Sequence, residues 1–514
     1  MYFGLRYGNS MIPAARFCIA TNISVGSRAL FNKRHLWLSA TSTNTDLTSA
    51  INGVAKDIQS IIPKSLEGAP VSMSYGDVCF AIVTQNYHGS EIDLLPQTLQ
   101  KALGVPSVHV LGTVVDKIIA ANNSTRFLST GLSILYHRNE GNTKVTPFYF
   151  GEENRARLKT NSVGRWHRSY DKKLDNSSFS IHPKIDLFES VSRPVFGGLV
   201  PDNLLKLEKD DVDLILMASD NESSQVLESL DKHFPSSTKI GIQGVQTPFL
   251  NGREFTIFGG KDVINSSGVS GVAFSKLKDS FSDLSLLYPT LVPISESVKI
   301  SRCRGNVILE LDNSDAVKEL IQFLKKHRTG SKSTVASDKN DISTRGEGGG
   351  IRDWENELYI KVICNPTDEG LSNDTAIYQI TGGDPGHGGL LVNSTKEFQV
   401  GQRVQFYIRQ PYKETKYDFD FESTKPSGPI VSFLCTPPEE VGSAASSDLL
   451  QTGSDNIGKV FGGSSEKGFI YGRPIVRSQK DSNNTSGSRF ESVAGQGSTE
   501  CSVSQSCVQI CLSN

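Results

Sequence analysis

The sequence lacks the close cysteine pairs from which most structural zinc and iron–sulfur sites are built. Its eight cysteines are scattered over 514 residues, and none forms a C-x-x-C pair. Because the ligands of such sites usually come in close pairs, we predict no metal site. The nine histidines contain neither an H-x-x-x-H nor an H-E-x-x-H pair. The helical zinc signature of many metalloproteases is therefore missing as well.

Long apolar runs and an excess of one charge are also missing. The apolar stretches, such as the one that ends at Ala218, are much shorter than the roughly 20 residues of a membrane helix. The formal net charge is -2, which does not point to nucleic acid or an anionic membrane as partner. We therefore expect no transmembrane segment and no DNA partner.

The glycine-rich segments do not have the spacing of known nucleotide-binding or hydrolase motifs. Residues 382–389 form the densest glycine cluster, but they match neither the P-loop nor the Rossmann pattern. Ser270 lies among glycines, yet the second glycine comes one place too early for the G-x-S-x-G nucleophile elbow. We assign no catalytic residue and no cofactor from these motifs. A catalytic triad assembled from distant positions stays open.

The first 45 residues contain no Asp or Glu but several basic side chains, namely Arg6, Arg16, Arg28, Lys33 and Arg34. An Arg-rich, Ser-rich and acid-poor segment is typical of mitochondrial transit peptides. The spacing of arginine, apolar residue and serine in residues 34–39 resembles a two-step matrix processing site, which places the mature start near Asn44. We expect residues 1–45 to be a targeting peptide outside the fold and the protein to be mitochondrial, in the matrix. An ordinary disordered tail is the alternative.

Two stretches of the chain repeat the same order of elements. Residues 48–62 have apolar positions at helical spacing. A buried strand is predicted over residues 77–84, a helix over 92–103 that ends at Gly104, and a second strand over 108–111. Later, residues 213–218, 224–234 and 239–240 repeat strand, helix and strand, each copy beginning with an Asp. We predict two related β-α-β units with parallel strands, although chance likeness of two common units is an alternative.

The second half is predicted to be rich in strands. Residues 306–311 alternate like a strand, and residues 315–326 form an amphipathic helix. Residues 329–350 are rich in Ser, Gly, Lys and Asp, which favours a disordered insertion. We therefore predict an α/β (α+β) protein with mixed β-sheets flanked by helices. It should have two lobes, the N-terminal one containing the duplicated β-α-β units.

These segments resemble the FIST family (F-box and intracellular signal-transduction proteins). Residues 77–112, 213–244 and 268–274 match its N-terminal part, and residues 305–312, 378–385 and 399–406 match its C-terminal part. The resemblance implies an N-terminal domain over residues 46–288 and a C-terminal domain over residues 289–514. It also implies a sensory or adaptor role, with small ligands such as amino acids, and supplies no catalytic residues. The leader shows no helical domain like an F-box, so we expect a mitochondrial member without one.

Candidate ligand-binding residues follow the parallel strands, where open α/β sheets usually bind their ligands. Gln85 and Asn86 follow the first strand of the first unit, whereas Asp220 and Asn221 hold the same place in the second. Gly241 and Gly244 stand where the family has paired glycines. These residues are suited to a small polar molecule, but turn and helix-cap chemistry explains them too. Our working hypothesis is a non-catalytic sensor of a small polar molecule or a scaffold for a protein partner. The alternative is an enzyme whose site is assembled from dispersed residues.

Overall fold

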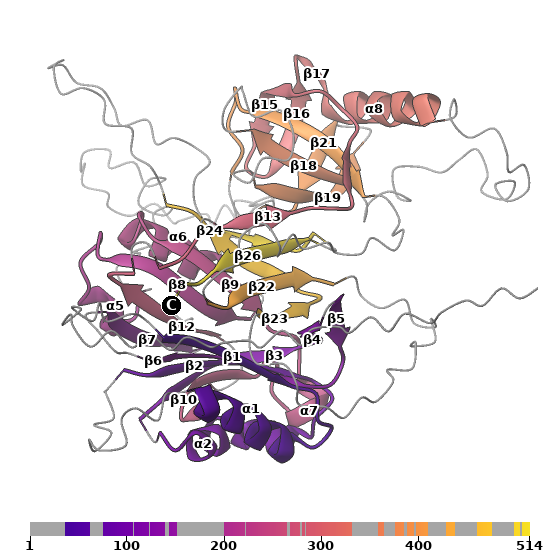
Figure 1. The fold of residues 1–514 in the computed structure, drawn as a ribbon. Coiled ribbons are helices and arrows are strands. Elements are labelled where there is room, and N and C mark those ends of the chain that lie inside the picture. Colours follow the sequence, from indigo (N-terminus) through magenta and orange to yellow (C-terminus); the bar gives the residue numbers. More distant parts are fainter. Residues whose placement is uncertain are drawn as a thin grey trace, which may run out of the picture.

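The computed structural model describes most of the chain beyond residue 35. The described residues are 36–61, 76–105, 107–122, 124–138, 143–151, 200–220, 223–264, 268–277, 280–282, 284–331, 358–363, 376–384, 388–394, 397–409, 428–436, 460–474, 498–503 and 506–513. They form mixed β-sheets with few helices, in a larger and a smaller lobe (Figure 1). The predicted α+β class is confirmed.

The larger lobe contains three repeats of one order of strands, of which we predicted two. The first repeat comprises β1 (Leu36–Ser42), α1 (Leu47–Ile61), β2 (Val78–Thr84), α2 (Gly89–Leu103), β3 (His109–Val115), β4 (Lys117–Asn122), β5 (Ser124–Leu128) and β6 (Leu132–Arg138). The second comprises β7 (Lys144–Gly151), α5 (Asp202–Leu205), β8 (Val212–Ser219), α6 (Ser224–His233), β9 (Thr238–Gln243), α7 (Pro248–Asn251), β10 (Ile257–Gly260), β11 (Asp262–Ile264) and β12 (Gly268–Ser275). The third comprises β13 (Ser285–Leu287), β22 (Ile430–Cys435), β23 (Val460–Ser465), β24 (Phe469–Gly472), β25 (Thr499–Cys501) and β26 (Cys507–Cys511).

Each repeat lends a hairpin to the sheet of another repeat. The three six-stranded sheets have the orders β1-β6-β2-β3-β10-β11, β7-β12-β8-β9-β24-β25 and β13-β26-β22-β23-β4-β5. In each sheet the third and fourth strands are parallel and the other pairs are antiparallel. The exchange is cyclic, so none of the three sheets is complete within its own repeat. The parallel pairs β2–β3 and β8–β9 confirm the pairing that we predicted for the first two units.

A glycine at one equivalent position marks all three repeats. A Cβ added to Gly112, Gly241 or Gly462 would lie 1.8, 2.5 or 1.9 Å from a carbonyl oxygen of the preceding parallel strand. Real Cβ atoms do not approach an oxygen so closely, so the second parallel strand of each repeat requires glycine here. The repeats therefore share a packing constraint as well as a strand order.

The Asp that begins each predicted unit ties the first parallel strand to the end of the last strand. In the first repeat the Tyr136 hydroxyl donates to Asp77 Oδ2 over 2.8 Å. In the second, the Leu277 backbone N–H donates to Asp213 Oδ2 over 2.7 Å. The two carboxylates thus perform the same structural task with different donors.

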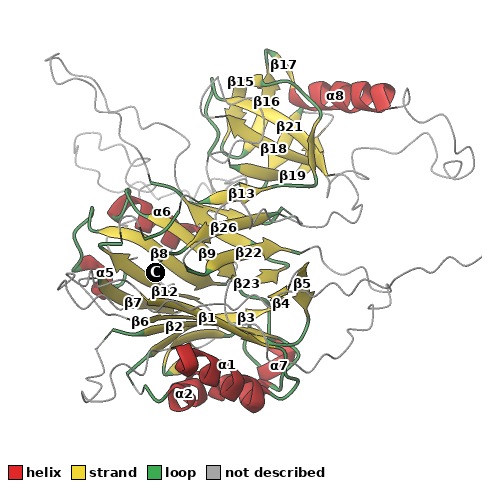
Figure 2. Cartoon of the chain, viewed as in Figure 1, coloured by secondary structure: helices red, strands yellow, loops and turns green. Residues whose placement is uncertain are grey.

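The inner faces of the three sheets share one apolar core. Phe80 of β2, Leu216 of β8 and Phe433 of β22 belong to the same buried cluster. Helices α1 and α2 cover the outer face of the first sheet, and α6 covers that of the second (Figure 2). This layering follows from strands that are apolar on both faces, because each face must be buried.

The smaller lobe is a closed antiparallel barrel that interrupts the third repeat. Its elements are β14 (Leu291–Pro293), β15 (Val298–Arg304), β16 (Val307–Leu311), β17 (Ser314–Asp315), α8 (Ala316–Ser331), β18 (Leu358–Ile363), β19 (Ile377–Asp384), β20 (Gly389–Val392) and β21 (Arg403–Arg409). Strand β21 pairs with both β15 and β18, which closes the ring. Tyr359 and Tyr407 of the barrel join the core of the larger lobe.

We expected the C-terminal domain to begin at residue 289, but the strand pairing groups the chain in another way. The barrel occupies residues 291–409, whereas residues 430–511 return to the sheets of the larger lobe. The predicted insertion over 329–350 begins inside α8, and its residues from 332 on lie outside the described residues.

The structure corrects the expectation that the first 45 residues stand outside the fold. Residues 36–42 form β1, which pairs with β6 along its whole length. Trp37 is 2% exposed and lies 5.0 Å from the ring of Phe274 in the second sheet. A leader that ended near Asn44 would remove this strand. The apolar Leu-Trp-Leu run after the basic residues is core sequence.

Candidate functional site

The predicted residues of the first unit hold loops together at the carboxyl end of β2. The Gln85 amide donates to Asp116 Oδ1 over 3.4 Å, and its backbone N–H donates to the Val115 carbonyl over 3.2 Å. The Asn86 amide donates to the Ser129 carbonyl over 2.8 Å. Both side chains are exposed. Their contacts are those of turn residues on an accessible surface.

Asp220 corresponds by strand register to Thr84 of the first unit, one residue before Gln85, and is fully buried. Its Oδ2 accepts a 2.6 Å hydrogen bond from the Gly268 N–H, and its own N–H donates to the Gly268 carbonyl over 3.0 Å. In the first repeat Thr84 makes the same pair of contacts with Gly131. Asp220 therefore closes the start of β12 onto β8. Asn221 lies outside the described residues.

A half-buried carboxylate lies near Asp220, and sequence reasoning missed it. Glu500 of β25 accepts hydrogen bonds from the Ser223 and Ser224 hydroxyls, over 2.5 and 3.1 Å, at the N-terminus of α6. Burial raises the pKa of Glu500, the Ser223 and Ser224 contacts lower it, and the charge of Asp220 raises it further. Glu500 and Ser223 are 277 residues apart in the chain, so no local pattern indicates their contact.

Gly241 and Gly244 serve close packing in the structure. A Cβ on Gly241 would lie 2.5 Å from the Met217 carbonyl oxygen, and one on Gly244 would lie 2.3 Å from Thr113 Oγ1. The Gly244 N–H donates to the Ser219 carbonyl over 2.7 Å. Among the described residues, no hydrogen bond joins Gly241 or Gly244 to Gln85 or Asn86. The latter two residues follow a strand of the first sheet.

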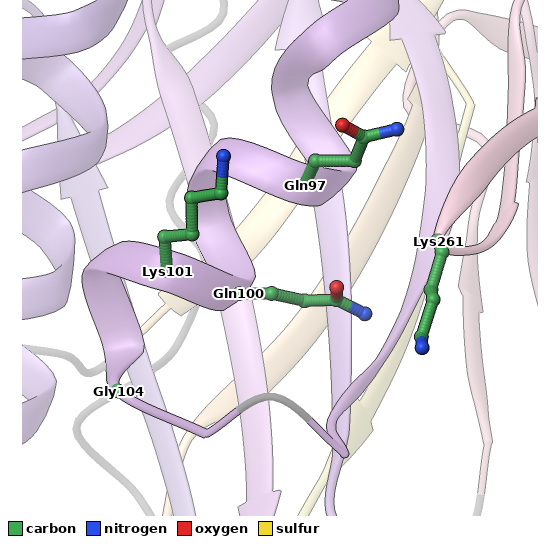
Figure 3. Close-up of a pocket in the computed structure, with 5 residues that line it drawn as sticks. All are labelled: Gln97, Gln100, Lys101, Gly104 and Lys261. Atoms are coloured by element: carbon green, nitrogen blue, oxygen red, sulfur yellow. The ribbon is translucent and has the colours of Figure 1, made fainter.

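The structure contains a groove that lies away from these loops. It is lined by Gln97, Gln100, Lys101 and Gly104 of the α2 region and by Lys261 of the β10–β11 turn, and its volume is about 460 Å³ (Figure 3). The groove is a depression that is widely open to solvent. Figure 3 shows Gln100 extending from α2 toward Lys261. The groove thus lies between a helix of the first repeat and a hairpin of the second.

The helix wall is fixed by the way α2 ends. Gly104 adopts the left-handed conformation, with φ 70°, and its N–H donates to the Lys101 carbonyl, which is a common C-terminal cap. The Gln100 side chain is 8% exposed and donates to the Val108 carbonyl over 2.7 Å. The Gln97 amide donates to Asp262 Oδ1 over 3.4 Å across the groove. Both amides are therefore positioned by partners on neighbouring segments of the chain.

The hairpin wall carries Lys261 beside His109. Gly260, with φ +89°, makes the turn, and a Cβ built there would lie 4.0 Å from His109 Nδ1. Partial burial lowers the pKa of His109, and the nearby Lys261 ammonium lowers it further. Beside the groove, at the exposed start of β3, the His109 imidazole thus favours its neutral form.

The equivalent interface of the second repeat is closed by polar contacts. There α6 meets the β24–β25 hairpin, and Ser498 stands where the register places Lys261 in the first repeat. Both the N–H and the hydroxyl of Ser498 donate to Asp231 of α6 over 2.6 Å. Asp231 also pairs with the buried Lys239 at 3.1 Å. Polar contacts therefore fill the interface between helix and hairpin in the second repeat, whereas the equivalent interface of the first repeat is left open as the groove.

No cluster of His, Cys, Asp and Glu suited to a metal ion was found within the described ranges. In the same residues, no helix is long and apolar enough to cross a membrane.

A comparison with known families gives a match to part of the chain. The model of the FIST N domain matches residues 77–314. The match supports a place in the FIST family. It covers the first two repeats from β2 onward and runs to the start of β17, so it contains the groove and all six predicted ligand-binding residues. FIST domains are a sensory family. A comparison with curated proteins found no match.

Proposed function

We propose that this FIST protein is a non-catalytic sensor that binds a small polar molecule in the groove between α2 and the β10–β11 turn. The observation that carries the proposal is the groove itself, about 460 Å³ in volume, within the part of the chain that matches a sensory domain. Its walls present amide and ammonium donors, and such groups fix the orientation of a polar ligand.

The position of the groove supports a sensing role. Its two walls come from different repeats, joined within the described residues by the 3.4 Å contact between Gln97 and Asp262. A ligand that contacts both walls stabilises their mutual arrangement, because it binds the folded pair and not the separated elements. Binding can thereby be transmitted to the apolar cluster between α2 and the first sheet.

A thermal-shift screen of residues 36–514 against amino acids and small metabolites tests this proposal. At a ligand concentration of 100 times Kd, stabilisation of about 2.7 kcal/mol is expected. Gln97→Trp, which fills the groove, should abolish the shift. Gln399→Trp places the same side chain at an exposed site of the barrel lobe and should leave it intact. If no compound raises the melting temperature, or if both variants respond as the wild type, the sensor proposal is wrong.

A protein-scaffold function is a second candidate because of two exposed apolar side chains. Phe249 of α7 is wholly exposed, and Leu94 of α2 is 56% exposed. The two helices are in contact, since the Asn251 amide donates to Asp93 Oδ1 over 2.9 Å. Proximity labelling by wild type and by the double variant Phe249→Ser, Leu94→Ser tests this candidate. Identical labelling profiles would count against it.

We also propose that the protein is mitochondrial, with a targeting segment that ends before β1. The support is the acid-free, arginine-bearing composition of residues 1–35. A fusion of residues 1–35 to a fluorescent protein should enter mitochondria, whereas a fusion with Arg6, Arg16 and Arg28 changed to Glu should not. Cytosolic fluorescence of the first fusion would refute the proposal.

A further inference from the structure

We propose that the groove selects a small carboxylate, with Lys101 and Lys261 supplying the positive charge and Gln97 and Gln100 supplying neutral donors. This inference rests on the proposed sensor function and names the ligand class of the same site.

The two ammonium groups are the first reason. Lys101 comes from the helix wall and Lys261 from the hairpin wall. Within the described parts of the chain, neither is within ion-pair distance of a carboxylate. Each sits on a flexible four-carbon stem, so both can reach an anion held between the walls.

The acidic groups around the groove offset only part of this charge, because Asp262 supplies one negative charge against the two lysines. Asp262 receives the Gln97 amide, and Asp93, one turn earlier on α2, pairs with Arg253 at 3.4 Å. In the second repeat, by contrast, the cation Lys239 has its partner Asp231 at 3.1 Å. The open interface therefore has an excess of positive charge where the closed one is balanced.

The helix end favours a carboxylate over a phosphate. The groove lies at the C-terminal end of α2, where Gly104 caps the helix. This end carries the negative pole of the helix dipole, which opposes an anion of either kind, so the lysines must supply the attraction. Phosphates are typically bound at helix N-termini by backbone N–H groups, and this end offers none. Each carboxylate group of a ligand can accept from one lysine ammonium and one glutamine amide. A ligand with two carboxylates would therefore use both lysines and both glutamines.

Isothermal titration calorimetry on residues 36–514 tests the inference with matched probes. Succinate supplies two carboxylates, succinamide is its neutral counterpart, and inorganic phosphate is the competing anion. Succinate should bind, more weakly at higher salt, and at least tenfold more tightly than the other two. Lys101→Gln and Lys261→Gln should each weaken succinate binding by about tenfold, the usual effect of losing one charge-assisted hydrogen bond. Lys209→Gln, an exposed lysine after α5, is the control and should have no effect.

The possible results separate this inference from the sensor proposal. If succinamide or phosphate binds as tightly as succinate, or if the two lysine variants bind succinate as the wild type does, the carboxylate inference is wrong. The sensor proposal survives that result if a neutral or cationic compound raises the melting temperature of the wild type and does not raise that of Gln97→Trp. If no compound of any charge binds, both proposals fail. Circular dichroism of each variant excludes loss of fold as the cause.

Discussion

Glu500 of β25 accepts a 2.5 Å hydrogen bond from the hydroxyl of Ser223, at the N-terminus of α6. The contact joins the third repeat to the second across 277 residues of chain. Burial raises the pKa of Glu500 more than the Ser223 and Ser224 hydrogen bonds lower it. Ionisation of this carboxyl therefore destabilises the fold, although the two serine hydroxyls favour the charged form. The exchange of hairpins between repeats is thus coupled to a titratable group.

The pH dependence of stability follows from that raised pKa. A carboxyl with a raised folded-state pKa contributes stability below its unfolded pKa, and this contribution is lost as the pH rises through the folded pKa. Glu500→Gln cannot ionise, so the wild type should lose stability relative to the variant between pH 5 and pH 8. Urea denaturation at both values measures the difference. Glu254→Gln, at an exposed position, should show no such trend, and a constant difference for Glu500→Gln would contradict this account.

The equivalent glycines predict that all three repeats are sensitive to an added Cβ, and Gly112 most of all because its φ is +134°. Gly112→Ala, Gly241→Ala and Gly462→Ala each place a Cβ within 2.5 Å of a carbonyl oxygen. We expect each to lower the free energy of unfolding by about 2–4 kcal/mol, since the backbone must move. Gly382→Ala is the control, because no atom lies within 4 Å of its added Cβ. Tolerance of Gly462→Ala alone would show that the third repeat does not share the constraint.

Because β1 is part of the fold, we predict that removal of the residues before Asn44 destabilises the protein. Trp37 is 2% exposed, and loss of a buried aromatic side chain costs about 3–5 kcal/mol. A chain that begins at residue 44 should therefore unfold at a much lower temperature than one that begins at residue 36. Trp37→Ala in the longer chain should account for much of the loss. Equal melting temperatures for the two chains would place β1 outside the stable fold.

The nearness of Lys261 to His109 predicts that Lys261 affects the titration of the His109 imidazole. Because burial and the Lys261 charge lower the pKa of His109, its contribution to stability is fully present above the ordinary histidine value of about 6.5 and is lost as the pH falls through the folded pKa. Lys261→Gln should raise the pKa of His109, as measured by NMR titration of the ring protons. Lys209→Gln should leave it unchanged. An unaltered His109 pKa in Lys261→Gln would mean that the hairpin wall lies farther from His109 than in the structure.

The sequence predicted those parts of the fold whose signal is local. Helices α1, α2, α6 and α8 were predicted from apolar spacing and end signals, and α2 ends at Gly104 as expected. Strands β2 and β8 were predicted as buried runs, and their parallel partners were found. Apolar periodicity and glycine caps are properties of neighbouring residues, so a single sequence contains them.

The parts that were missed depend on contacts between distant residues. The third repeat went unnoticed because the barrel separates β13 from β22. Strand β1 follows a basic segment and was assigned to a leader. The groove forms where α2 meets a hairpin from another repeat, and its Gln97–Asp262 contact spans 165 residues. Only the cyclic exchange of hairpins brings these walls together.

Hydrogen–deuterium exchange with and without a ligand from the thermal-shift screen tests the central claim most directly. We predict slower exchange in residues 97–104 and 260–262, which form the two walls of the groove, and unchanged exchange around Gln85 and Asp220. Protection confined to the loops after β2 and β8, with none at the groove, would contradict the account.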